Sequence, residues 1–111
     1  MKMKLKTLMI IDKIDRIDLL KNKIANLQDY CMKEDHELVL EIVMMGSAVT
    51  YFKDFNDDNE LLKLDADIAL CNNALSMHGI KPIQYQNLRT VVAGVGEILV
   101  KKTEGWVDYL I

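Results

Sequence analysis

Cys71 is the residue of this chain with the clearest potential for chemistry. It follows the apolar run 68–70 and precedes Asn72 and Asn73, a polar pair that favours the start of a helix. In an open α/β sheet, ligands collect outside the carboxyl ends of the strands, and a helix N-terminus favours the thiolate form of a cysteine. The spacing therefore predicts a reactive thiol at the edge of a sheet. The alternative is inert packing, because cysteine is among the most often buried residue types.

Other patterns of chemistry-bearing residues are incomplete. The cysteines and histidines do not form the short Cys-x-x-Cys or His-x-x-x-His pairs of a compact metal site, so neither a metal nor a cofactor is expected. The P-loop and the dinucleotide-binding glycine motif are absent, since Gly94-x-Gly96 alone is too common to count. The acidic stretch 56–60 lacks the alternating ligands and the glycine of an EF-hand, which favours a solvated loop.

Length and charge limit the function classes. The chain has 111 residues, which predicts a single domain over residues 1–111. With 14 basic and 17 acidic residues it is a poor candidate for nucleic-acid binding, which needs a clustered basic face. The apolar run 8–11 ends at Asp12 and is too short for a secretory signal or a membrane span. Two unpaired cysteines without a secretion signal predict a cytoplasmic protein.

The apolar patterns predict strands that alternate with helices. Strands are expected over residues 5–11, 38–45, 68–71, 89–93 and 106–111. A first amphipathic helix, with Asp15 as its N-cap, is expected from the three-four spacing of its apolar residues, which are Ile17, Leu20, Ile24, Leu27 and Cys31. Burial is the expected role of Cys31. A second helix is expected after Gly46-Ser47, because apolar residues recur there at helical spacing, namely Ala48, Tyr51, Phe52 and Phe55. Shorter helical segments are expected over residues 61–64 and 72–78. A last helix is expected from Val95 to Gly105.

This alternation predicts a three-layer α/β/α sandwich around a five-stranded, mainly parallel sheet, with a strand order that the pattern does not set. Four turns, each following a strand and preceding a helix, are then expected on one edge of the sheet, around Asp12, Gly46, Cys71 and Gly94. We name this edge the rim. The candidate site residues on it are Cys71 for catalysis and, for ligand binding, Gly46, Ser47, Asn72, Asn73, Gly94 and Val95. Ser47 and Asn73 have helix capping as their alternative role.

Three segments of the chain resemble the DsrE family: Cys-Asn-Asn-Ala-Leu-Ser-Met-His-Gly-Ile over 71–80, Val-Ala-Gly-Val-Gly-Glu-Ile over 92–98, and Glu-Gly-Trp over 104–106. Asn26-Leu27, Gly46 and Val49 also fall where that family has similar residues. The resemblance implies a flavodoxin-like DsrE fold, a homotrimer or hexamer, and a cysteine, here Cys71, that accepts and passes on persulfide sulfur. The chain departs from the family pattern at three positions, which are Met45, Ala74 and Lys102.

The leading hypothesis is a cytoplasmic sulfur carrier with sulfurtransferase-like activity at Cys71, acting between a sulfur donor protein and an acceptor protein. The alternative is a non-catalytic oligomeric module that binds a small ligand or a partner, and a purely structural oligomer is a third reading. Apolar residues near the predicted surface favour a closed homo-oligomer. These residues are Met44, Met45, Met77, Trp106, Tyr109, Leu110 and Ile111.

Overall fold

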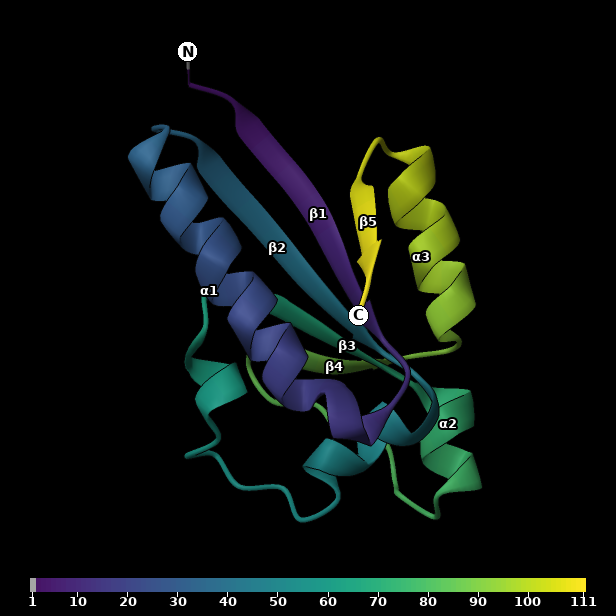
Figure 1. The fold of residues 1–111 in the computed structure, drawn as a ribbon. Coiled ribbons are helices and arrows are strands. Elements are labelled where there is room, and N and C mark those ends of the chain that lie inside the picture. Colours follow the sequence, from purple (N-terminus) through teal and green to yellow (C-terminus); the bar gives the residue numbers. More distant parts are fainter. Residues whose placement is uncertain (1) are drawn as a thin grey trace.

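The computed structural model describes residues 2–111, and its centre is one parallel sheet of five strands (Figure 1). The strands are β1 (Lys4–Ile11), β2 (Glu37–Met44), β3 (Asp67–Cys71), β4 (Leu88–Val91) and β5 (Val107–Leu110). Their order across the sheet is β4-β3-β2-β1-β5, and all neighbouring pairs are parallel. The strands of the sheet therefore all end on the same side, as the sequence predicts for the rim.

Helices cover both faces of this sheet. The helical segments are η1 (Ile14–Arg16), α1 (Ile17–Lys33), η2 (Gly46–Phe52), η3 (Glu60–Lys63), α2 (Asn72–Met77) and α3 (Gly94–Thr103). On one face α1 packs on the larger core, in which Leu20 and Ile24 meet Ile42 of β2. On the other face Ile98 of α3 packs on a small core around Val43. The arrangement confirms the predicted three-layer α/β/α sandwich of flavodoxin-like type.

The connection between β2 and β3 differs from the sequence prediction. In place of an α-helix extending to Phe55, a 3-10 segment covers Gly46–Phe52, and Phe55 lies beyond it against the ring of Tyr85. Two β-branched residues and two aromatic residues occupy positions 49–52, and such residues lose side-chain freedom in an α-helix. The Thr50 hydroxyl also donates a hydrogen bond of 2.6 Å to the carbonyl of Ser47, within the same segment.

The first helix confirms its predicted apolar stripe but not its predicted cap. Ile17, Leu20, Ile24 and Cys31 are all buried along α1, as their spacing indicates. The chain enters α1 through the 3-10 turn η1, however, and the N-cap residues of the two segments are Lys13 and Arg16, neither of which makes a side-chain capping bond, so Asp15 is not an N-cap. Cys31 has 2% of its surface exposed, which agrees with its predicted packing role.

The apolar residues expected near the surface divide into three groups, one of which is the half-buried pair Met45 and Trp106. Met44 and Ile111 are buried, contrary to expectation, because Met44 pairs with strands on both sides and Ile111 continues the bonding of β5 through Ile10. Met77, Tyr109 and Leu110 are exposed, as expected. Within residues 2–111, no helix combines the length and the apolar character needed to span a membrane.

Candidate functional site

The rim is built by turns that approach one another closely. The Met45 N–H donates to the Ile11 carbonyl over 2.9 Å, which joins the ends of β1 and β2. Gly46 follows with a φ of +51°, and a Cβ at this position would lie 2.4 Å from the Asp12 carbonyl oxygen. Only glycine meets both requirements without strain. Gly46 therefore has a structural role, because it lets the first two turns of the rim pack together.

Ser47 stabilises this same junction. Its Oγ accepts a hydrogen bond of 3.0 Å from the Ile14 N–H, at the start of η1. The side chain therefore joins the second turn of the rim to the first. The sequence left two roles open for Ser47, ligand binding and helix capping, and did not predict this link between turns. The Ser47 oxygen is therefore used as an acceptor for η1, while the hydrogen of the same hydroxyl group remains available to donate to a ligand.

Cys71 lies at the last position of β3 and is the N-cap residue of α2. It pairs with Val91 of β4, and its backbone is still extended, with φ −68° and ψ 118°. Its sulfur forms no disulfide, and 8% of the residue surface is exposed. The strand thus places the thiol at the carboxyl edge of the sheet, mostly covered by its neighbours.

Gly94 is the neighbour that brings a third turn against Cys71. A Cβ at Gly94 would lie 3.4 Å from the Cβ of Cys71 and 2.5 Å from the Cγ and Sδ atoms of Met45. The amino end of α3, the thiol-bearing residue and the Met45 side chain therefore share one small volume. The N–H groups of the first turn of α3 have no acceptors within the helix, so hydrogen-bond donors are available in this part of the rim.

The remaining predicted site residues lie around this junction with different exposures. Asn72 is half-buried, while Asn73 and Val95 are exposed. Neither asparagine side chain makes a hydrogen bond to another described residue of the chain. Both amides therefore remain free to hydrogen-bond a ligand that approaches from the solvent side.

The histidines and Cys31 do not extend this site. His78 is the C-cap residue of α2, at the end of the helix away from Cys71. His36 directly precedes β2 and accepts a hydrogen bond from the Met3 N–H, at the amino ends of the strands. Cys31 lies in the core near the end of α1. Within residues 2–111, no group of three histidine, cysteine or carboxylate side chains is placed to hold a metal ion.

A buried charge cluster under α3 is the feature that sequence reasoning missed. Glu41 lies in the middle of β2 with 1% of its surface exposed, and Arg89 of β4 donates to its Oε1 over 3.0 Å. The same guanidinium donates to Glu97 of α3 over 2.7 Å, and the Lys101 ammonium lies 4.0 Å from Glu41. The available signal was a single charged residue inside an otherwise apolar strand, which burial makes unfavourable unless it is paired or protonated.

The cluster binds a proton more tightly than its carboxylates would in water. Burial, together with the neighbouring Glu97, raises the pKa of Glu41 to about 8, against the opposing effect of Arg89 and Lys101. Burial acts on Glu97 in the same direction, but hydrogen bonds with Glu41 and Arg89 lower the pKa of Glu97. The proton therefore resides on Glu41, the more buried acid. A protonated Oε2, which otherwise has no partner, can donate to Glu97.

Comparison with known proteins supports the fold and leaves the function open. No family model matches the chain, and no curated protein matches it. Among solved structures, the chain is similar to MTH1491, a protein of unknown function from Methanobacterium thermoautotrophicum, with 23% sequence identity and a TM-score of 0.69. The alignment covers 99% of this chain and 98% of that protein. The two proteins thus share the fold over nearly their whole lengths.

Proposed function

We propose that this protein is a DsrE-like sulfur carrier in which Cys71 accepts and passes on persulfide sulfur. The observation that supports this most strongly is the position of Cys71, a free thiol at the carboxyl edge of a parallel sheet where three turns converge. Ligands of open α/β sheets bind at this edge. The resemblance of segments 71–80, 92–98 and 104–106 to the DsrE family adds to this argument.

The proposed reaction exchanges sulfur–sulfur bonds without net oxidation. The Cys71 thiolate attacks the outer sulfur of a donor persulfide, a new S–S bond forms, and the donor leaves as a thiolate. The outer sulfur and its proton now belong to Cys71. An acceptor thiolate then attacks that outer sulfur, and Cys71 leaves as a thiolate, ready for another cycle.

The rim supplies what this exchange requires. The persulfide sulfur would extend beyond Cys71, which is mostly buried, toward the exposed side of the junction. N–H groups at the start of α3 and the free amide of Asn72 would donate hydrogen bonds to it. Met45 would provide apolar contact at the same junction, where its side chain lies over Gly94. Such a site fits the reducing cytoplasm, where both cysteines stay free.

One observation favours a second candidate function, a non-catalytic binding module. Cys71 has only 8% of its surface exposed, and no histidine or carboxylate in residues 2–111 hydrogen-bonds to it. In this reading the rim holds a small ligand or a partner through backbone donors and asparagine side chains, and Cys71 contributes shape alone.

Intact-mass measurement distinguishes the two candidates. The protein is incubated with inorganic polysulfide as the sulfane-sulfur donor, beside the variants Cys71→Ser and Cys31→Ser. We expect the native protein and Cys31→Ser to gain the mass of one sulfur atom, and dithiothreitol to remove it. We expect Cys71→Ser to gain none. A gain that persists in Cys71→Ser, or no gain in any form, would contradict the sulfur-carrier proposal.

A further inference from the structure

The amino-terminal half of β2 has a strand partner on one side only. β1 pairs with β2 along its whole length, from Lys4 opposite Glu37 to Ile11 opposite Met44. β3 starts to pair later, at Glu41 opposite Asp67. Residues 37–40 therefore present a free strand edge on the β3 side, which is a ready template for pairing with another chain.

The free edge carries unused backbone hydrogen-bonding groups. Glu37 donates its N–H to Met3 and Met45 donates its N–H to Ile11, both on the β1 side. Because successive backbone groups of a strand point to opposite neighbours, the N–H groups of Leu38 and Leu40 point toward the free edge. In residues 2–111 no backbone hydrogen bond from a turn or loop reaches these two groups.

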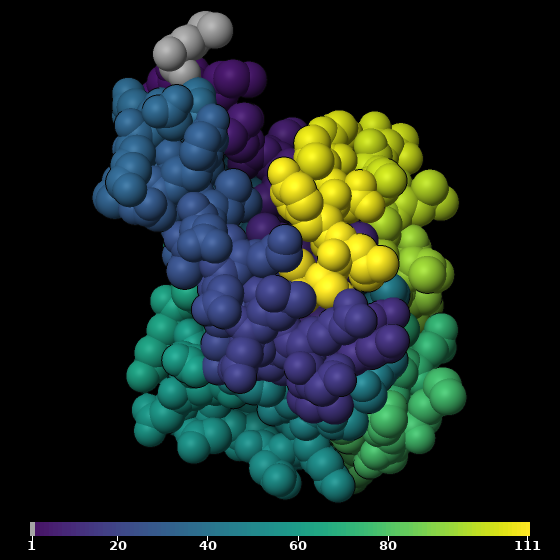
Figure 2. Space-filling model, in the orientation of Figure 1, coloured from purple at the N-terminus to yellow at the C-terminus, as the bar shows by residue number. Residues whose placement is uncertain are grey.

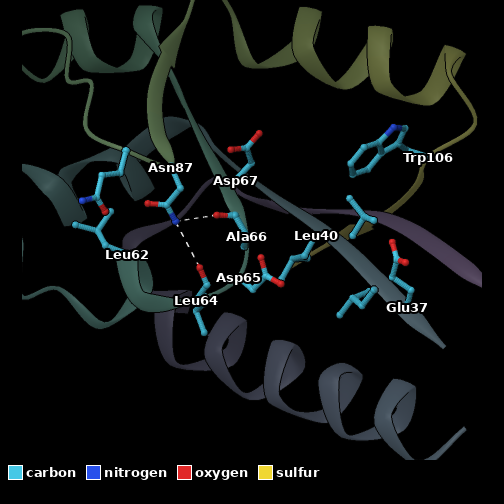
Figure 3. Close-up of a pocket in the computed structure, with 12 residues that line it drawn as sticks. Glu37, Leu40, Leu62, Leu64, Asp65, Ala66, Asp67, Asn87 and Trp106 are labelled. Carbon is cyan, nitrogen blue, oxygen red and sulfur yellow. Dashed lines mark hydrogen bonds between the residues drawn. The ribbon is translucent and has the colours of Figure 1, made fainter. Parts of the chain in front are cut away.

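A hollow of about 600 Å³ lies beside this edge (Figure 3). Its walls include residues 37–40 of β2, the loop 64–66 that leads into β3, and Asp67 at the start of β3. The Asn87 side-chain amide holds that loop, since it donates to the Ala66 carbonyl over 2.8 Å and to the Leu64 carbonyl over 3.5 Å. The loop is thereby kept from continuing β3 along β2, and the notch stays open. We name this hollow the edge notch.

The two sides of the edge notch differ in chemistry. Leu38 and Leu40 face the α1 side, where Leu62 and Leu64 also line the hollow. Glu37 and Val39 alternate with them, so they face the α3 side, together with Asp67 and Trp106. The lining as a whole contains three carboxylates, from Glu37, Asp65 and Asp67, and no basic side chain.

Basic side chains of the chain itself lie around the α3 side of the notch. The ammonium groups of Lys101 and Lys6 lie 4.9 and 5.9 Å from the centre of the Trp106 ring, and Lys4 pairs with Glu37. The Lys4 ammonium lies 3.8 Å from Glu37, and both side chains are more than half exposed, so the pair is strongly screened.

Asp65 and Asp67 form no salt bridge within residues 2–111, although the charge of Asp67 acts on Arg89 of the neighbouring strand. The side chains that line the notch are therefore acidic on one side of the free edge and apolar on the other, and the basic side chains nearby stand outside the lining.

We propose that the edge notch binds an extended, basic peptide segment of a partner protein, which adds as a strand to residues 37–40 of β2. Strand addition supplies affinity through backbone hydrogen bonds and specificity through alternate side chains. Apolar side chains of the segment would meet the leucines, and lysine or arginine side chains would meet the carboxylates of Glu37, Asp65 and Asp67. This surface is separate from Cys71 and does not depend on the sulfur-carrier proposal.

Trp106 gives a direct assay, because it is the only tryptophan of the chain and it lines the notch. The probe is a short blocked peptide of alternating lysine and valine, titrated into the full protein at low salt. We expect saturable quenching or a spectral shift of the tryptophan emission. We also expect slower hydrogen exchange at the amides of Leu38 and Leu40.

Two matched peptides separate strand addition from simple charge attraction. In the first, alternate backbone nitrogens are methylated, and we expect about tenfold weaker binding because backbone hydrogen bonds are lost. In the second, glutamate replaces lysine, and we expect no saturable binding. In the protein, Asp65→Asn combined with Asp67→Asn should weaken binding of the lysine peptide about three- to tenfold, because two exposed carboxylates of the lining lose their charge.

Three results would overturn the proposal. The first is no fluorescence or exchange response to the lysine peptide at millimolar concentration. The second is equal binding of the methylated peptide, which would mean that charge alone drives the contact. The third is protection of the Leu38 and Leu40 amides that rises with protein concentration without any peptide, because a second copy would then occupy the notch.

Discussion

Gly46 shows how single residues shape the rim. Its positive φ requires a left-handed backbone, and its missing Cβ leaves room for the Asp12 carbonyl. Gly79, after α2, also has a positive φ, of +67°, but nothing lies within 4 Å of the place where its Cβ would be. The two glycines thus share the conformational requirement and differ in the steric one, which makes them a matched pair.

Alanine substitution should separate these two requirements. We expect Gly79→Ala to lower the free energy of unfolding by about 1–2 kcal/mol, which is the strain of a left-handed alanine. Gly46→Ala should lower it further, by about 1–3 kcal/mol more, because its methyl group overlaps a backbone oxygen. Urea denaturation of both variants measures the difference. An equal decrease in the free energy of unfolding for the two variants would show that the contact between Gly46 and the Asp12 carbonyl adds nothing to the cost of the substitution.

At the scale of elements, the charge cluster joins α3 to the middle of the sheet. Glu41 comes from β2, Arg89 from β4, and Glu97 and Lys101 from α3. The Arg89 guanidinium bonds to both glutamates and so links all three elements. Ala69 lies opposite Arg89 in the neighbouring strand, and its small side chain leaves room for the arginine to reach Glu41.

The stability of the protein should depend on pH through Glu41. Its pKa is about 8 in the folded protein and 4.5 in the unfolded chain, so the folded state binds the proton more tightly between these values. The free energy of unfolding should therefore fall as the pH rises from 5 to 8, by on the order of a few kcal/mol. Glu97 has a lowered pKa, so its contribution is lost only below about pH 4.5.

Glu41→Gln should remove this pH dependence, because glutamine resembles the protonated acid. We expect the variant to match the native protein near pH 5 and to exceed its stability near pH 8, as measured by urea denaturation at each pH. Glu37→Gln, at the exposed start of the same strand, is the control and should keep the native slope. A native slope in Glu41→Gln would mean that Glu41 is already ionised across this range.

The sequence predicted most elements because their apolar patterns match their burial. The continuous runs of β1 to β3 are buried, and the stripe of α1 faces the core. It failed for η2, where helical spacing was present but the residue types disfavour an α-helix. The strand order could not be predicted, since it depends on contacts between distant segments.

The candidate site was predicted in outline only. The turn motifs around Gly46, Cys71 and Gly94 do meet at the carboxyl edge, because parallel strands all end there. The role of Ser47 and the charge cluster around Glu41 could not be predicted, because both depend on three-dimensional partners that lie far away in the sequence. The edge notch depends on the unequal lengths of β2 and β3, which no local pattern specifies.

At the scale of the whole molecule, several large apolar side chains of α3 and β5 are exposed. Leu99 of α3 and Leu110 of β5 have 68% and 69% of their surfaces exposed, and Val95 is equally open. These two elements follow each other in the chain and lie together on one side of the molecule, in yellow tones in Figure 2. Exposed apolar patches of this kind mark interaction surfaces.

We expect this side to form the contact of a closed homo-oligomer, and the DsrE resemblance implies a trimer or hexamer. Leu99→Glu should convert it to monomers, because a buried charge without a partner opposes association. Met32→Glu, at an exposed position of α1, is the control and should leave the assembly intact. Light scattering at micromolar concentration measures both. A native protein that is monomeric at that concentration would contradict the expectation.

The most direct test of the proposed function is the relative alkylation rate of the two cysteines in the folded protein. The protein is treated briefly with iodoacetamide, digested and mapped by mass spectrometry, with a urea-unfolded sample as the reference for equal access. If Cys71 presents its sulfur at the rim, it should be labelled much faster than Cys31 in the folded state, and at a similar rate in urea. Equal and slow labelling of both cysteines in the folded protein would contradict the proposal that Cys71 carries sulfur.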